Sequence, residues 1–235
     1  MNKEAAQIQR MFASIAGRYD LANRVLSLSL DRYWRRRAVS KLEPFLPHDA
    51  LVLDLCTGTG DLAFELSKLA QVVGCDFCRP MLTLGQKKAE QNELRHGVEF
   101  VEGDALSLPF PSHLFDAVTI AFGLRNLENY HTGLREIHRV LRPSGSLLML
   151  EFAQPQVPIF RYLYLFYFTR ILPRLGQLVS GETGPYSYLP QSVREFPDPR
   201  GLEKILRQEG FMVASRHAMT WGVVSLYVGT KQEEG

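Results

Sequence analysis

The chain has 235 residues, 46% of them hydrophobic and 22% charged, and its formal net charge at pH 7 is +2. This length and composition predict one large domain with a full apolar core, and the small net charge gives no indication of a nucleic-acid partner. The polar segment Met1–Arg10 lacks the apolar centre of a secretory signal, which favours a cytoplasmic location. Three cysteines do not form a disulfide framework, and the pair Cys75 and Cys78 has no second pair to complete a metal site. We therefore expect reduced thiols and no bound metal.

Residues 5–43 show the apolar spacing of amphipathic helices, interrupted at Gly17. The aromatic side chains of Phe12, Tyr19 and Trp34 fit two arrangements there. They pack within an N-terminal helical layer, which composition favours, or they fold over a ligand as a lid. A basic cluster in this region is typical of a solvated helix face, with an anionic membrane surface or an acidic partner as alternatives; it comprises Arg32, Arg35, Arg36 and Arg37.

The next segment reads as a strand, a glycine turn and a helix. The apolar run 51–55 predicts a buried parallel strand, and Gly58 and Gly60 allow the following backbone to pass close to a ligand. The start of a helix offers unpaired N–H groups at the same place, so the segment is typical of a nucleotide-type binding turn. We expect the carboxylates of Asp54 and Asp61 to repel a pyrophosphate and to attract a cationic ligand. This charge pattern favours S-adenosylmethionine over a dinucleotide.

Strands and helices then alternate, which predicts an α/β fold with a parallel, doubly wound sheet. Further strands are expected at 71–76, 98–101, 115–122, 146–152, 211–217 and 223–229, the last of them antiparallel at or near the edge. Helices are expected at 81–94, 130–141 and 200–209, a turn at 143–145 and a loop at 184–190. The single predicted domain, 1–235, has four parts: an N-terminal helical layer (1–47), a cofactor-binding core (48–152), an aromatic and helical segment (153–200) and a C-terminal helix with strands (201–235).

Polar groups follow the predicted parallel strands where each strand ends. Asp76 suits the two hydroxyls of a ribose, or else the cap of the next helix, and Asp104 suits the exocyclic amine of an adenine. Arg125 and Asn126 follow the fourth strand. Because the carboxyl ends of parallel strands meet at one edge of a sheet, we expect these side chains to lie together.

The aromatic segment 159–168 has an uncharged stretch, Tyr162 to Thr169, that is far shorter than the roughly 20 residues of a membrane span. An interfacial helix, a dimer surface, the wall of an apolar pocket and burial in the core all fit its composition. Pocket or membrane contact is favoured because the Tyr and Arg tips prefer water.

Several motifs together resemble those of class I S-adenosylmethionine-dependent methyltransferases: Asp54, Thr57–Asp61, Asp76, Gly103–Ala105, Phe115–Asp116 and Arg139–Gly145. A second set resembles, more narrowly, the C-methyltransferases of menaquinone and ubiquinone biosynthesis: Met11–Phe12, Tyr19–Asp20, Asn23, Phe122–Asn126, Leu150–Phe152, Tyr186–Leu189 and Phe196–Pro197. The resemblance implies a Rossmann-like, seven-stranded, mostly parallel sheet with an antiparallel strand near the edge. It also implies N-terminal helices and a helical insertion before the last two strands.

The resemblance implies S-adenosylmethionine as the cofactor, with contacts from Asp54, Gly58, Thr59, Gly60, Asp76, Phe77, Asp104, Ala105 and Ala121. Ala121 stands where family members often have serine, so any contact there comes from the backbone. The implied reaction moves a methyl group to a ring carbon beside a hydroxyl of a reduced, prenylated quinone. The implied catalytic residues are Arg125, Asn126, Tyr19 and Tyr188, with His131 and Glu151 as possible bases.

Several alternatives stay open at this point. Arg125 also fits a salt bridge to Glu128 or Asp116. Demethylmenaquinol is the expected acceptor, and a ubiquinone-precursor benzoquinol or another hydrophobic phenol is the alternative. A dinucleotide-dependent oxidoreductase and a non-catalytic assembly subunit fit less well. We expect the aromatic segment to admit an isoprenoid tail at the inner face of the cytoplasmic membrane, with help from Arg161, Arg170 and Arg174, and a homodimer is left open.

Overall fold

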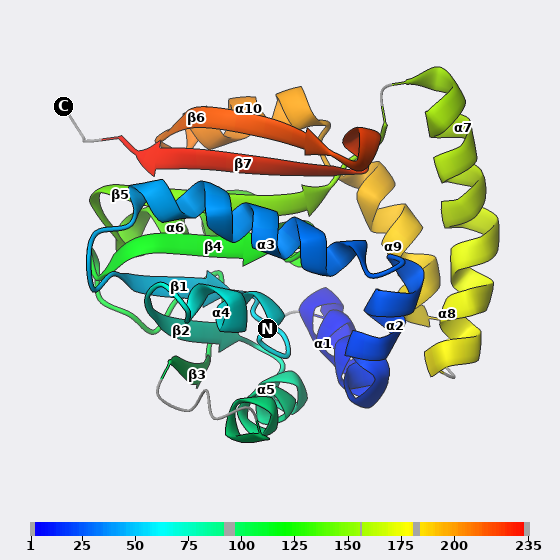
Figure 1. Ribbon diagram of the computed structural model, residues 1–235, viewed down its shortest axis with the longest axis horizontal. Helices are drawn as coiled ribbons and strands as arrows, with labels where there is room; N and C mark the ends of the chain where they lie inside the picture. Colours follow the sequence, from blue (N-terminus) through cyan, green and yellow to red (C-terminus); the bar gives the residue numbers. More distant parts are fainter. Residues whose placement is uncertain (1–2, 92–96, 156, 181–183, 233–235) are drawn as a thin grey trace.

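The structure, a computed structural model, describes residues 3–91, 97–155, 157–180 and 184–232. Its centre is a seven-stranded sheet with the order β3-β2-β1-β4-β5-β7-β6 (Figure 1). The strands are β1 (Leu51–Leu55), β2 (Gln71–Asp76), β3 (Val98–Glu102), β4 (Phe115–Ala121), β5 (Leu141–Phe152), β6 (Phe211–Met219) and β7 (Val224–Lys231). β7 pairs antiparallel with β5 and β6, whereas β1 to β5 pair in parallel.

Ten α-helices occur in the described residues: α1 (Lys3–Ile15), α2 (Tyr19–Leu26), α3 (Leu30–Leu42), α4 (Asp61–Leu66), α5 (Arg79–Gln91), α6 (Tyr130–Val140), α7 (Pro158–Phe166), α8 (Leu172–Ser180), α9 (Gly184–Glu195) and α10 (Pro199–Gln208). The π-helix η4 (Tyr167–Ile171) joins α7 to α8, and the short 3₁₀ helices include η3 (Leu124–Asn126) and η5 (Thr220–Gly222). Among the described residues, no helix is both long and apolar enough to cross a bilayer.

The sheet has an apolar core on each face. One core lies under α6 and α10 and contains Phe115, Leu134 and Leu206, while the other lies under α3 and α4 (Figure 1). The central strands are therefore buried on both faces, which explains why β1 and β4 read as nearly continuous apolar runs. The fold class and the antiparallel strand next to the edge, both predicted from the sequence, are confirmed.

A third layer covers the carboxyl ends of the parallel strands. It consists of α1, α2 and α9 together with the continuous column α7–η4–α8 (Figure 1). Its own apolar cluster includes Ala22 of α2 and Tyr164 and Phe168 of the column. Ligands of open parallel sheets bind at this edge, so the layer lies where it encloses the site.

Two local predictions were wrong. The predicted loop 184–190 is the first part of α9, which contains Pro190 in its interior and packs against α1 and α8. The glycine and prolines indicated a loop, but tertiary packing outweighs the helix-breaking tendency of one proline. The predicted turn 143–145 lies within β5 as a bulge, with Ser144 at φ 57°. The predicted helix end at Leu94 lies outside the described residues, and α5 is described to Gln91.

Candidate functional site

Two adjoining cavities lie at the carboxyl ends of the parallel strands. The small cavity has a volume of about 290 Å³, and the large cavity has a volume of about 390 Å³. Their common wall consists of Phe12, Tyr19, Cys56, Gly58, Ala121 and Phe122. Since each of these residues borders both spaces, a ligand in one cavity lies directly beside a ligand in the other.

The small cavity contains the predicted acidic groups that follow β2 and β3. The buried Asp76 accepts hydrogen bonds from the backbone N–H groups of Gly58 (2.8 Å) and Cys78 (2.9 Å). Burial raises the pKa of Asp76, and the backbone hydrogen bonds leave the carboxylate with acceptor capacity for a ligand hydroxyl. Asp104, which is exposed, and the adjacent Ala105 line the same cavity. Phe77 lines the same space, so the predicted ribose and adenine contacts share one cavity.

The glycine turn after β1 has the predicted special geometry. Gly58 and Gly60 have φ angles of +58° and +84°, which L-residues rarely adopt. A Cβ atom on Gly60 would lie 2.8 Å from Cζ of Phe100, so the turn packs closely against β3. A Cβ atom on Gly58 would meet nothing within 4 Å, because this position faces the cavities. The turn therefore leaves open space in which a ligand can come close to the protein backbone.

Asp54, at the base of the turn, is only 1% exposed. Its two carboxylate oxygens accept hydrogen bonds from the hydroxyls of Thr57 and Thr119, each at 2.7 Å. Burial raises the pKa of Asp54 to about 6, and these hydrogen bonds only partly offset the effect. Asp54 also lines the large cavity, where a bound cation would favour its ionised form.

The charge of Asp61 is compensated, which the sequence did not indicate. The Lys88 ammonium lies 2.6 Å from Asp61, 2.9 Å from Asp20 and 3.1 Å from the Thr59 hydroxyl. Burial alone would raise the pKa of Asp61, but the charges of Arg35 and Lys88 outweigh it and lower that pKa. The Asp61 carboxylate therefore stays ionised but is paired with Lys88, which weakens the predicted repulsion of a pyrophosphate.

Arg35 was also misread as part of a solvated basic cluster. Its side chain is 11% exposed, lies in the wall of the large cavity, and pairs with Asp31 at 2.6 Å. The neighbouring Arg36 is 68% exposed and does fit a solvated face. The helical period of α3 separates these two side chains, a signal that was available in the sequence.

The turn after β4 presents the central polar pair. Phe122 has a φ of 58°, and a Cβ atom on Gly123 would lie only 2.5 Å from Cβ of Cys56. Glycine is thus required for the close approach of this turn to the end of β1. The fully buried Leu124 then anchors η3, whose remaining residues are Arg125 and Asn126.

The side chains of Arg125 and Asn126 both donate hydrogen bonds to the same backbone carbonyl oxygen. Nη1 of Arg125 donates to the oxygen of Phe122 (2.6 Å) and to Oε1 of Glu151 (2.6 Å). Nδ2 of Asn126 donates to the same Phe122 oxygen at 3.1 Å. The ion-paired side chains of Arg125 and Glu151 are 7% and 1% exposed, so the pair is shielded from water. Arg125 lines the large cavity and Asn126 the small one, which places the pair at the boundary.

The structure corrects the partners predicted around Arg125. A salt bridge exists, but to Glu151 rather than to Glu128 or Asp116, and Asp116 pairs with Arg142 instead. Glu151 is therefore paired with Arg125 and is not free to act as the base that removes the acceptor's proton.

The candidate base His131 was also misplaced. Its Nδ1 lies 2.8 Å from Oε1 of Glu209, and the side chain lines neither cavity. His131 therefore contacts Glu209, the residue that follows α10, rather than a ligand in either space.

The large cavity has mainly apolar walls, formed by the helical layer and the turn between α2 and α3. Tyr19 borders both cavities and Tyr188 borders the large one, and burial raises the pKa of both hydroxyls. The two arrangements predicted for the N-terminal aromatics both occur. Trp34 is buried in the core under α3 and also lines the large cavity, and Phe12 and Tyr19 line both cavities.

Comparison with known proteins places the chain in a family. The profile of the ubiE/COQ5 methyltransferase family matches residues 1–231. The chain belongs to this family. A demethylmenaquinone methyltransferase of Deinococcus radiodurans is 49% identical over 228 residues, which cover 96% of this chain and 92% of the relative. A demethylmenaquinone methyltransferase of Thermus thermophilus is also 49% identical, over 94% of this chain and all of the relative (100%).

The ubiE/COQ5 family assignment agrees with the fold. A SAM-dependent methyltransferase of Thermotoga maritima superposes with a TM-score of 0.66 at 16% identity, covering 95% of this chain and 99% of that chain. At this identity the likeness supports the fold alone. As a member of the ubiE/COQ5 family, the chain is an S-adenosylmethionine-dependent methyltransferase. The open space at Gly58 and the lone pairs of Asp76 fit this cofactor.

Proposed function

We propose that this methyltransferase methylates a ring carbon of a reduced, prenylated quinone, with demethylmenaquinol as the acceptor and menaquinol as the product. The observation that carries the proposal is the position of Arg125 and Asn126 at the boundary between the small cavity and the apolar large cavity. The names of the two relatives support the acceptor class. A ubiquinone-precursor benzoquinol carries the same ring oxygens and is the acceptor to compare.

The cofactor would lie in the small cavity and reach the common wall. Asp76 would accept the ribose hydroxyls, and Phe77, Asp104 and Ala105 would enclose the adenine. The turn with Gly58, Thr59 and Gly60, together with Asp54 and the backbone of Ala121, would hold the amino-acid end. When bound, S-adenosylmethionine supplies an electrophilic methyl group on a sulfonium.

Arg125 and Asn126 would act on the acceptor hydroxyl. Among the described residues, Nε of Arg125 and Oδ1 of Asn126 are buried and lack a hydrogen-bond partner. The amide oxygen of Asn126 can accept a hydrogen bond from the phenolic hydroxyl. The guanidinium of Arg125 can stabilise the phenolate that forms as the ring carbon becomes nucleophilic. Because the surrounding walls are mainly apolar, these interactions are stronger than they would be in water.

Glu151 would position Arg125, while the tyrosines would orient the ring. The ion pair keeps the guanidinium in one orientation and gives the buried pair no net charge. The raised pKa values of Tyr19 and Tyr188 keep their hydroxyls protonated at neutral pH, so both suit hydrogen bonding to quinol oxygens rather than proton removal.

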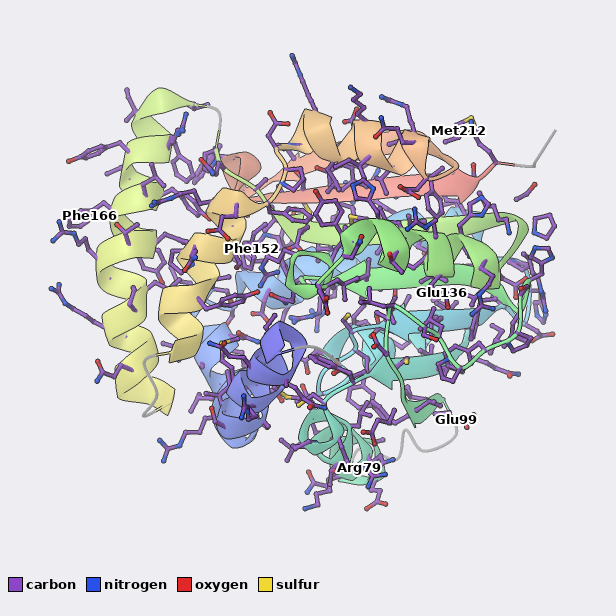
Figure 2. The ribbon with its side chains drawn as sticks, turned by 180° about the vertical axis from the view of Figure 1, so that it is seen from behind. Arg79, Glu99, Glu136, Phe152, Phe166 and Met212 are labelled. Carbon is purple, nitrogen blue, oxygen red and sulfur yellow. The ribbon has the colours of Figure 1, made fainter. Side chains whose placement is uncertain are left out.

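We further propose that the large cavity admits the isoprenoid tail from an anionic membrane surface. Exposed apolar side chains surround its outer wall: Leu28, Leu30, Ile159, Tyr162, Leu163, Phe166 and Trp221. Figure 2 shows Phe166 on the outer side of α7 and Phe152 between the helices and the sheet. Residues 157–180 carry Arg161, Arg170 and Arg174 but no Asp or Glu, which favours anionic lipid at the inner face of the cytoplasmic membrane.

The acceptor is tested by methyl transfer from labelled S-adenosylmethionine to a short-tailed demethylmenaquinol, beside a benzoquinol precursor. We expect label on the naphthoquinol ring and a loss of about 100- to 1000-fold in kcat/KM for Arg125→Ala. The control Arg36→Ala removes a 68% exposed arginine and should leave the rate unchanged. Cofactor binding without label on either quinol would contradict the proposal.

A further inference from the structure

Four side-chain polar atoms in the described residues are buried without a hydrogen-bond partner: Nε of Arg24, Nε of Arg125, Oδ1 of Asn126 and Oη of Tyr164. Such atoms are rare in folded proteins, because an unmade hydrogen bond in the interior costs about 1–3 kcal/mol. Three of the four belong to residues that line the two cavities. Two of these three already have a place in the proposed chemistry, and Tyr164 does not.

Tyr164 lies on α7 in the wall of the large cavity, and 7% of its surface is exposed. Its ring is fixed by packing: the centroid lies 4.4 Å from that of Phe168, which in turn lies 6.0 Å from that of Phe152. The hydroxyl is therefore held in place by the ring but is not used by the protein. This arrangement is typical of a group whose partner arrives with a ligand.

The nearby Tyr167 shows the contrasting case. It lies three residues further along the column and lines the same cavity, but its hydroxyl donates to the backbone oxygen of Leu26 at 2.8 Å. The Tyr167 hydroxyl joins the column to α2 and so has a structural partner. Only Tyr164 of this pair has an unused hydroxyl.

The chemistry of Tyr164 suits a neutral hydrogen-bonding group. Burial raises the pKa of this hydroxyl well above its ordinary value, and the charge of Arg125 lowers it only in part. Tyr164 therefore stays protonated at neutral pH and can donate a hydrogen bond to a ring oxygen.

We propose that the Tyr164 hydroxyl binds the second ring oxygen of the acceptor, while Arg125 and Asn126 hold the oxygen beside the carbon that receives the methyl group. This inference rests on the proposed quinol methylation. Asn126 borders the small cavity and Tyr164 only the large one, so the two ends of a 1,4-diol would be recognised by different elements. A phenol with one oxygen would leave Tyr164 unpaired, and such sites discriminate strongly against the analogue that lacks the group.

The test compares Tyr164→Phe with Tyr167→Phe. Both acceptors are short-tailed: a reduced 1,4-naphthoquinol, and the matching naphthol that lacks the second oxygen. Binding of each acceptor to the protein loaded with S-adenosylhomocysteine is measured by anaerobic calorimetry, with KM, kcat and the thermal midpoint as further readouts. For Tyr164→Phe we expect about tenfold weaker binding and a higher KM with the diol, and no change with the naphthol.

The thermal midpoints of the ligand-free proteins test independently whether the Tyr164 hydroxyl lacks a partner within the protein. Tyr164→Phe removes an unsatisfied buried hydroxyl, so its midpoint should equal or exceed that of the parent. Tyr167→Phe loses a hydrogen bond to Leu26, so its midpoint should fall, without any preference between the two acceptors. Equal losses for diol and naphthol, or a midpoint for Tyr164→Phe as low as that of Tyr167→Phe, would overturn the role of Tyr164.

Turnover and binding separate this inference from the function on which it rests. A parent protein that turns over no quinol contradicts the proposed function, whereas the binding comparison still decides the role of Tyr164. A parent that binds diol and naphthol equally, or binds neither, overturns the inference.

Discussion

At the scale of single residues, the carbonyl oxygen of Phe122 organises the polar end of the large cavity. It accepts from Arg125 and Asn126 at once, and Glu151 holds the guanidinium from the neighbouring strand. None of the three side chains can shift alone without breaking a buried hydrogen bond. Their effects on activity should therefore be strongly coupled.

The first prediction concerns Glu151→Gln, which keeps the shape of the side chain and removes its charge. We expect kcat to fall at least about tenfold and the thermal midpoint to drop, because the buried Arg125 charge loses its counterion. Cofactor affinity, measured by calorimetry, should stay unchanged. The matched control is Asp116→Asn, an 11% exposed acid that pairs with Arg142 outside the cavities. The positioning role fails if both variants lose stability and neither loses kcat.

The second prediction concerns pH and Asp54. The folded-state pKa of about 6 lies above the ordinary value of 3.8, so the folded protein holds this proton more tightly than the unfolded chain. The associated stability is present below about pH 4 and is lost as the pH rises through about 6, by an amount on the order of 3 kcal/mol. Relative to Asp54→Asn, the ligand-free parent should therefore lose free energy of unfolding over this range. Denaturant titrations at several pH values measure the difference, and a constant difference would contradict the assignment.

The site residues that sequence reasoning could predict are those at strand ends. Asp76, Asp104, Arg125 and Asn126 follow parallel strands, and the topology brings them to one edge. The partner of Arg125 was not predictable in the same way. Glu151 lies 26 residues further along the chain, and only the register of β4 against β5, with Ala121 opposite Leu150, brings it beside Arg125.

At the scale of elements, α7 presents two different faces. Tyr164 is buried toward the large cavity, whereas Ile159, Tyr162 and Phe166 are 79%, 73% and 53% exposed. The turn between α2 and α3 adds Leu28, which is 80% exposed. A helix with this division suits contact with a lipid surface on one side and with a ligand on the other.

The third prediction tests that outer surface with Leu28→Asn combined with Phe166→Gln. Asparagine suits the positive φ of position 28, so the turn should persist. We expect binding to vesicles of phosphatidylcholine and phosphatidylglycerol to weaken by at least about tenfold in sedimentation assays, because two apolar side chains no longer enter the membrane. Added salt should weaken the parent's binding through the arginines of 157–180.

The matched control for the vesicle assay is Met212→Gln. Met212 is 55% exposed, close to the value for Phe166, but lies on β6 at the other side of the molecule (Figure 2). Equal losses in both proteins, or no vesicle binding by the parent, would contradict the membrane proposal.

The element boundaries that the sequence missed share one cause. The segment 184–190 has the glycine and prolines of a loop, yet α9 forms there because it packs between α1 and α8. Local composition reports intrinsic preference, whereas these boundaries depend on neighbours that are distant in the chain. The aromatic segment was ambiguous for the same reason, since both of its faces read as apolar.

At the scale of the whole molecule, α1 and α2 form a cover that contributes to the walls of both cavities. Gln9 donates to the backbone oxygen of Phe77 at 2.6 Å, and Lys88 on α5 bonds to Asp20 on α2. The cover is held by these polar contacts and by two small apolar clusters rather than by the main cores, so it should open more readily than the sheet.

The fourth prediction follows from that cover. In Lys88→Met, amide hydrogens of α2 should exchange several-fold faster in the ligand-free protein, and those of β4 should not change. Mass spectrometry of exchanged peptides measures both. Lys68→Met is the control, because Lys68 is 59% exposed and pairs with Glu65 away from α2. S-adenosylhomocysteine should slow exchange in α1 and α2 of the parent, and its failure to do so would contradict the assignment of α1 and α2 as a cover.

The overall topology was the most predictable feature, because alternating strands and helices constrain a parallel sheet to few arrangements. The division into two cavities was not predictable. It depends on how α1 and α2 meet the ends of β1 and β4, because the common wall joins residues as far apart in the chain as Phe12 and Phe122.

The linings of the two cavities occupy different parts of the chain. Every residue that lines the small cavity falls between Gln9 and Glu128, whereas the large cavity takes all of its remaining C-terminal lining from Phe152 to Val223. We therefore expect acceptor preference to depend partly on residues 152–223, a continuous stretch that contributes nothing to the small cavity. Exchange of this stretch between relatives would alter the wall of the large cavity in a single segment, and every residue that lines the small cavity would be inherited unchanged.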